Sequence, residues 1–174
     1  TGIFSSIKFI RNSEFMHLDG VAVKNLELLT SMATGKTENS LLDIIDATKT
    51  PMGARTIRQW LIKPLMNLDK IKNRQRAVNY FIENGDIRRD ISEKLKSVSD
   101  IERIIARIST GSAGPRDLTA LKDSLEIINE VSEILKTTEG LKADIPKNEE
   151  VIKKISEHIV DEPPVTLKDG NVIR

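Results

Sequence analysis

Residues 115–135 read PRDLTALKDSLEIINEVSEIL, and this stretch decides the fold class. Pro115 suits the first turn of a helix, because its missing N–H is not needed there. Apolar residues follow at near-heptad spacing, and others widen the stripe, so the segment predicts a long helix that is covered on more than one face. The stripe comprises Leu118, Leu121, Leu125, Ile128 and Leu135, widened by Ile127, Val131 and Ile134.

Helical periodicity continues on both sides of this segment. A short helix should follow Ser40, a second should start at Thr50-Pro51 and stop at Pro64, and a last should cover 151–159. Further helices are expected to begin at Asp69, Gly85-Asp86 and Asp100. Apolar residues expected to face inward are Ala54, Ile57, Leu61, Ile71, Val78, Phe81, Ile82, Ile101, Ile104, Ile105 and Ile108, with Arg55, Arg58 and Gln59 facing outward.

The two ends of the chain predict small β elements. Residues 15–18 and 26–30 read as short strands with a brief helical turn between them, and 165–174 alternates around Asp169-Gly170, a hairpin signal for a final strand that lacks its partner. Residues 1–14 show no period and read as a connector. The predicted fold is therefore mainly α, a bundle of about six to seven helices with small β elements near the N- and C-terminal ends.

The composition is that of an ordinary globular protein, with 39% apolar and 30% charged residues among 174. Without cysteine, the chain has no disulfide framework, thiolate metal site or cysteine nucleophile. No apolar run approaches the roughly 18 residues of a membrane span, and no signal peptide is visible, so we expect a cytoplasmic protein without membrane contact. Because the chain begins with Thr1 rather than methionine, we expect it to be a piece of a longer protein.

Charge is unevenly distributed along the chain. The net charge is +1 in total, but it is −1 over residues 1–51, +7 over 52–116 and −5 over 117–174. The basic segment 52–116 could face phosphates or an acidic partner. Solvated helix surfaces explain it more simply, and we favour that interpretation.

Motifs that could carry chemistry are weak. Gly35-Lys36-Thr37 resembles the end of a phosphate-binding loop, but Thr30 stands where that motif needs its first glycine. His17 and His158 have no metal-ligand partner at helical spacing. Trp60 is expected to pack between helices rather than to stack on a base. The sequence thus predicts no catalytic, cofactor-binding or metal-binding residue and leaves DNA-binding residues unassigned.

Ordered motifs run through nearly the whole chain. They comprise Phe15–Asp19 with Lys24–Leu28, Ser40–Asp43 with Thr48–Arg55, Arg58–Leu61 and Pro64-Leu65, then Arg74–Val78, Asp100–Arg103, Arg107-Ile108, Pro115–Leu118 with Leu121, and finally Pro163-Pro164 with Gly170–Arg174. Together they resemble the core domain of the MutS family of DNA mismatch-repair proteins, in its bacterial form. The resemblance implies that residues 15–160 are the first half of that helical core domain and that 161–174 begin a truncated passage to the lever and clamp.

The resemblance also implies the setting in which such a domain works. Members of this family are dimeric, ATP-regulated proteins that encircle duplex DNA and recognise mispairs, with MutL as the expected partner. Their mismatch wedge and their ATP- and magnesium-binding P-loop lie in other domains, so none of those residues can be carried over to this chain. The implied function is a non-catalytic joint that links the ATPase mechanically to the DNA clamp.

The basic segment also allows a different function. The main alternative is an independent nucleic-acid-binding module that uses the basic segment 52–116. Its candidate residues are Arg55, Arg58, Arg74, Arg76, Arg88 and Arg89. A helical adaptor outside repair and an enzyme in its own right are less favoured. If the chain is truncated, the 118–135 helix should expose an apolar stripe, and the fragment should self-associate.

Overall fold

The computed structural model describes residues 14–136, 145–164 and 170–174, which are largely helical. This confirms the mainly α prediction. The helices are α1 Gly20–Asn25, α2 Leu41–Ile45, α3 Pro51–Ile62, α4 Leu68–Glu83, α5 Gly85–Lys96, α6 Ile101–Ser109, α7 Pro115–Lys136 and α8 Glu149–His158. In the described residues, β pairing is limited to the isolated bridges Phe15–Leu65 and Ile159–Ile173.

The chain divides into two compact units. The first consists of the described residues up to 47 together with 56–75, and the second of 48–55 with the described part of 76–174. Two helices are therefore shared: α3 contributes 51–55 to the second unit and 56–62 to the first, and α4 is divided after residue 75.

In the first unit, a loop between α1 and α2 is closed by backbone hydrogen bonds. The N–H of Leu41 donates to the carbonyl of Glu27 at 2.9 Å, and that of Leu42 donates to Leu28 at 3.0 Å. Leu28 and Leu42 are buried beside this closure. Ser40 is fully buried and caps α2 by accepting the N–H of Asp43, as the sequence predicted.

The strand expected at 15–18 is reduced to a single bridged residue, and the strand expected at 26–30 is wrong. Asp19 accepts the N–H of Ala22 at 2.7 Å and starts α1, so the chain turns helical directly after the first segment, which keeps only the Phe15–Leu65 bridge. Residues 26–30 form turns. The N–H of Leu28 donates to the carbonyl of Val23 in α1, so the chain folds back on the end of that helix.

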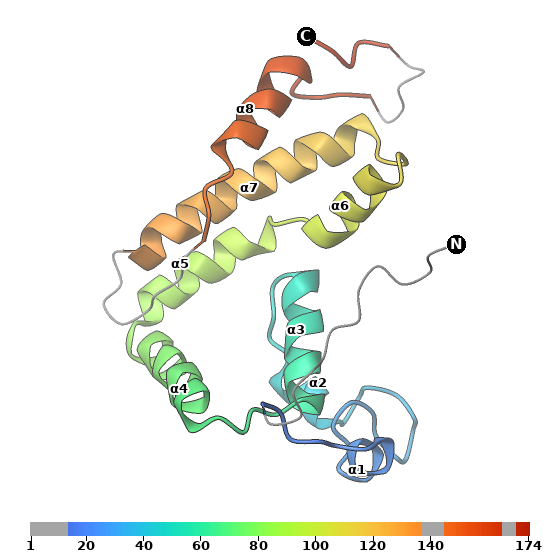
Figure 1. Ribbon diagram of the computed structural model, residues 1–174, viewed down its shortest axis with the longest axis vertical. Coiled ribbons are helices and arrows are strands. Elements are labelled where there is room, and N and C mark those ends of the chain that lie inside the picture. Colours follow the sequence, from blue (N-terminus) through green and yellow to red (C-terminus); the bar gives the residue numbers. More distant parts are fainter. Residues whose placement is uncertain (1–13, 137–144, 165–169) are drawn as a thin grey trace. The chain divides into compact units, whose positions relative to one another are not determined.

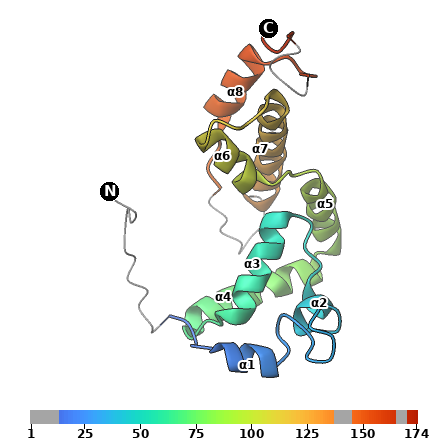
Figure 2. The ribbon, with the colours of Figure 1, turned by 90° about the vertical axis from the view of Figure 1, so that its right-hand side faces the viewer.

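In the second unit, α7 packs against α5, α6 and α8 (Figure 1, Figure 2). Ile104, Leu121, Leu125 and Ile155 form its buried core, joined by half-buried neighbours such as Leu118. The core therefore draws on α6, α7 and α8 together, and the heptad-like stripe supplies its central layer. This confirms the long helix and its covering on more than one face.

Helix starts were predicted with mixed success. Thr50 and Asp100 cap α3 and α6 as expected, with Thr50 accepting the N–H of Gly53 at 3.0 Å. Asn67, not Asp69, accepts the N–H of Lys70 and starts α4, since a cap must lie outside the first turn. Helix α5 begins at Gly85 without a side-chain cap, so Asp86 lies in its first turn rather than capping it.

Several residues expected to face inward are exposed. Val78 and Ile82 of α4 and Ile105 and Ile108 of α6 have 40% or more of their surface exposed, because neighbouring elements cover only part of each apolar stripe. The expected exposed stripe on α7 is also wrong. Its large apolar side chains are buried or half-buried, because α5, α6 and α8 already cover them.

The C-terminal residues have a β partner, contrary to expectation. Val160 donates its N–H to Val172, and Arg174 donates to His158, each at 3.1 Å. This short antiparallel pairing joins the end of α8 to the last residues of the chain, and Val172 is buried beneath it. Asp169 of the predicted turn lies outside the described residues, whereas Gly170 adopts φ +72°, a conformation that favours glycine.

Candidate functional site

The Gly35-Lys36-Thr37 segment is a self-closed loop. The N–H of Ser31 donates to Lys36, and the N–H of Gly35 donates to Ser31, both at 2.8 Å. The next helix begins only at Leu41. A phosphate-binding loop instead turns its N–H groups outward at a helix start, so this geometry agrees with a polar loop.

The two histidines lie apart from any cluster of ligating groups. His17 is exposed in the extended segment before α1, and the Nδ1 atom of His158 lies 2.8 Å from the carbonyl of Lys154. Within residues 14–136, 145–164 and 170–174, no three His, Asp or Glu side chains gather as a metal site would require. In the same residues, no helix is both long and apolar enough to cross a membrane.

Much of the basic segment 52–116 is engaged inside the protein. Arg88 donates to the carbonyl of Phe81, and Arg89 pairs with Asp86 in α5. Further pairs are Lys94–Glu130, Lys96–Glu93, Arg103–Asp100 and Arg107–Asp117. A cation that already faces a carboxylate offers less to a phosphate, so this pairing favours helix surfaces over a DNA-binding patch.

In the first unit, Arg74 covers the lone tryptophan. Its guanidinium carbon lies 3.6 Å from the ring centroid of Trp60, a cation–π contact between α4 and α3. Trp60 remains 44% exposed, so it packs between helices, as expected, but is not a core residue. Arg58 lies exposed on α3. The structure therefore does not bring the six candidate arginines together on one surface patch of either unit.

The most developed polar site of the second unit is built around Arg55. Its Nη atoms donate to both oxygens of Asp100, at 2.9 and 2.7 Å, and its Nε donates to Glu102 at 2.8 Å. Asp100 also accepts the N–H of Arg103 as the cap of α6, and only 15% of its side chain is exposed. One carboxylate thus holds the first turn of α3 and the start of α6 at once. We name Arg55, Asp100 and Glu102 the α3–α6 ion cluster.

The α3–α6 ion cluster should make stability depend on acid pH. The hydrogen bonds from Arg55 lower the pKa of Asp100 from 3.8 to about 2. Since the folded pKa is the lower one, this stabilisation is complete above pH 3.8 and disappears as the pH falls through about 2. We expect Asp100→Asn to reduce the loss of unfolding free energy across that window, measured by urea titrations at several pH values. Identical acid profiles for both proteins would contradict this assignment.

A second bidentate pair joins α6 to α7. Arg107 donates from Nε and Nη2 to Asp117, at 3.0 and 2.6 Å. Asp117 also accepts the N–H of Gly114, and these contacts lower its pKa, with Arg107 the larger cause. The pair clamps the loop between the two helices, where Gly111 takes φ +68°. Like the first cluster, it fixes a helix junction.

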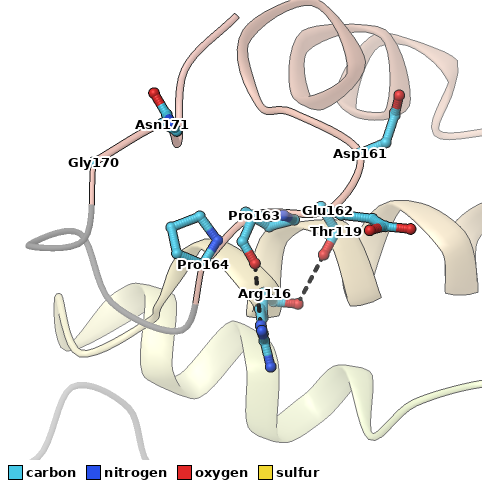
Figure 3. A pocket seen from close by; sticks show the side chains of 8 residues that line it. All are labelled: Arg116, Thr119, Asp161, Glu162, Pro163, Pro164, Gly170 and Asn171. Atoms are coloured by element: carbon cyan, nitrogen blue, oxygen red, sulfur yellow. Dashed lines mark hydrogen bonds between the residues drawn. The ribbon is translucent and has the colours of Figure 1, made fainter.

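A pocket of about 610 Å³ lies beside the C-terminal segment (Figure 3). The Nε of Arg116 donates to the carbonyl of Pro163 at 3.1 Å, and Thr119 donates to the carbonyl of Arg116. Asp161, on another wall, pairs with Arg174. Because these groups already bind one another, the pocket is better described as the junction that holds the C-terminal segment on α7 than as a cofactor site.

The pairing within the α3–α6 ion cluster is not evident from the sequence. Helical periodicity predicts Arg55 on the outer face of α3 and Asp100 only as a helix cap. Both residues belong to the ordered motifs, so the motif pattern marked them without indicating that they pair. The pairing spans 45 positions in the sequence.

A family model described as MutS domain III matches residues 21–174. This chain belongs to the MutS family. The DNA mismatch repair protein MutS of Methanothrix thermoacetophila is 38% identical over 97% of this chain. Those of Acetivibrio thermocellus and Synechococcus elongatus are 41% and 35% identical over 94% and 93%. The chain spans only about a fifth of the length of these relatives.

The matched region therefore includes the α3–α6 ion cluster, the Arg107–Asp117 pair, and α7 with the helices α5, α6 and α8 that pack against it. The match begins one residue after the start of α1 and extends to Arg174. The predicted identity, a core-domain fragment of a MutS protein, is confirmed by this match and by the relatives.

Proposed function

We propose that this MutS domain III is a non-catalytic transmission element, which links a nucleotide site to a DNA clamp located in other domains. The observation that carries the proposal is the length of α7 and its packing against three other helices. Helix α7 has 22 residues, which at 1.5 Å per residue gives a rod of about 33 Å. It packs against α5, α6 and α8. A packed rod of this length can pass a displacement from one end to the other.

The helix junctions support the same proposal. Bidentate arginine–carboxylate pairs fix the α3–α6 and α6–α7 connections, and Lys94 of α5 pairs with Glu130 of α7 at 2.7 Å. Bidentate pairs restrict orientation as well as distance. A displacement of one helix is therefore passed to the next helix at these junctions and is not taken up by movement of the connecting loops.

The setting of this element is proposed from its relatives, which are DNA mismatch repair proteins by name. We propose that the full-length protein binds mismatched duplex DNA as a dimer, uses ATP with magnesium at a P-loop beyond these residues, and recruits MutL. None of these roles is assigned to a residue of this chain.

A core variant in a full-length MutS protein that carries this domain tests the transmission role. Leu125→Val removes one methylene from the α7 core. We expect mismatched DNA to alter ATP turnover roughly twofold to tenfold less than it does in the wild type, because coupling residues typically contribute that much. Basal ATP turnover and DNA affinity should remain near wild type, since neither site is touched.

Ile105→Val is the matched control, because Ile105 is 51% exposed on α6. It should leave the response of ATP turnover to mismatched DNA unchanged. If Leu125→Val also preserves that response while measurably lowering stability, the transmission role is wrong.

A further inference from the structure

The first residues of α3, 51–55, belong to the second unit. No residue of α3 is buried. The extensive helix–helix packing among the described residues lies between α7 and its neighbours α5, α6 and α8, and does not include α3. Residues 52–55 are half-buried, so the first turn of α3 has no buried side chain to anchor it, and polar contacts contribute to its position.

The α3–α6 ion cluster supplies those contacts. Arg55 binds both oxygens of Asp100 and one oxygen of Glu102. This two-carboxylate geometry needs the planar fork of arginine, and a lysine ammonium cannot reproduce it. Asp100 is largely shielded, with 15% of its side chain exposed, whereas Glu102 is 67% exposed. Half of the cluster is thus open to solvent, where dissolved ions screen it.

Arg55 also occupies a special place along the chain. It is the last residue that α3 contributes to the second unit, and from residue 56 the helix belongs to the first unit. Breaking the cluster would free one helical turn without opening the core around Leu121 and Leu125.

We propose that the α3–α6 ion cluster is a releasable latch, which sets whether motion of α6 and α7 is passed into α3. The latch deepens the proposed transmission function and depends on it for its role, although its release can be measured without it. Its regulation is electrostatic: salt, or an anionic group brought close to Arg55, competes for the guanidinium and weakens the hold on α3.

Hydrogen exchange on the 174-residue chain tests the latch directly. We expect Arg55→Lys to speed exchange of the Ala54 amide and its neighbours in the first turn of α3 roughly threefold to tenfold, as loss of one partly exposed ionic contact would. In the wild type, the same amides should exchange faster as NaCl rises. Exchange in α7 should not change. Asp100→Asn should reproduce the effect, since it removes the charge while keeping an oxygen that can cap α6.

Arg107→Lys is the matched control, because it breaks the other bidentate pair of the same unit. It should speed exchange at Ser112, in the loop before α7, and at Asp117, in the first turn of α7, and leave α3 unchanged. Equal exchange of α3 in the wild type and Arg55→Lys would overturn the latch, and so would a uniform increase over α3 and α7, which would indicate global destabilisation.

The role in transmission is then tested with Arg55→Lys in a full-length MutS protein that carries this domain. A weaker response of ATP turnover to mismatched DNA, with that of Arg107→Lys closer to wild type, would support it. Faster exchange of α3 combined with an unchanged response would leave the latch as a structural fact and overturn its role in transmission. If Leu125→Val still weakens the response, the proposed function itself survives that result.

Discussion

We expect Ile104→Ala to lower the unfolding free energy of the 174-residue chain by about 2–5 kcal/mol. Ile104 is 3% exposed and lies with Leu121, Leu125 and Ile155 where α6, α7 and α8 meet. Truncation to alanine removes three carbon atoms and leaves a cavity that three packed helices cannot easily close. Urea titration followed by circular dichroism measures the change.

The neighbouring residue provides the control. Ile105 is 51% exposed on the same helix. Ile105→Ala removes the same atoms but leaves no cavity inside the protein, and alanine has the higher helix propensity. The unfolding free energy should therefore change by no more than about 1 kcal/mol. Equal destabilisation by the two variants would show that the core does not lie where the structure places it.

This pair also shows what the sequence could and could not predict. Helical periodicity is local, so Ile101, Ile104, Ile105 and Ile108 could be assigned to one apolar stripe of a short helix. Which edge of that stripe is covered depends on the direction from which α7 approaches. Ile104 is buried and Ile105 is not, and that distinction arises only in the packed bundle.

Polar contacts also divide into local ones, which the sequence predicts, and long-range ones, which it does not. Ser40, Thr50 and Asp100 act within three residues of their own position, so their roles could be predicted from the sequence. The pairing of Arg55 with Asp100 spans 45 positions and depends on where two helices meet. The ordered motifs predicted the family but not these contacts, because a motif records which residues occur and not which of them touch.

The β segments were over-predicted for a related reason. Three leucines in 26–30 suggested a short strand, but Leu28 is buried by turning back toward α2. A run this short has no sheet to join, and its backbone groups are satisfied in the loop instead.

Ser124 should be sensitive to loss of its hydroxyl. It is 1% exposed; its Oγ accepts the N–H of Ser99 at 3.0 Å and donates to the carbonyl of Ala120 at 2.6 Å. Ser124→Ala leaves the Ser99 amide, which lies in the α5–α6 connection, without this partner. We expect the unfolding free energy to fall by about 1–3 kcal/mol, the cost of leaving a partly buried donor without a partner. Urea titration measures it, and hydrogen exchange at Ser99 should rise.

Ser132, two turns further along α7, should respond in the opposite direction. It is 0% exposed, and its Oγ has no hydrogen-bond partner among the described residues. In Ser132→Ala, a buried polar group that is already unsatisfied is replaced by a methyl group of similar size, and alanine favours the helix. The unfolding free energy should therefore stay constant or rise by up to about 1 kcal/mol. The two variants make the same chemical change on the same helix, so only the hydrogen-bond partners can separate them. A loss at Ser132 as large as that at Ser124 would mean that its hydroxyl has a partner and that burial alone does not explain its position.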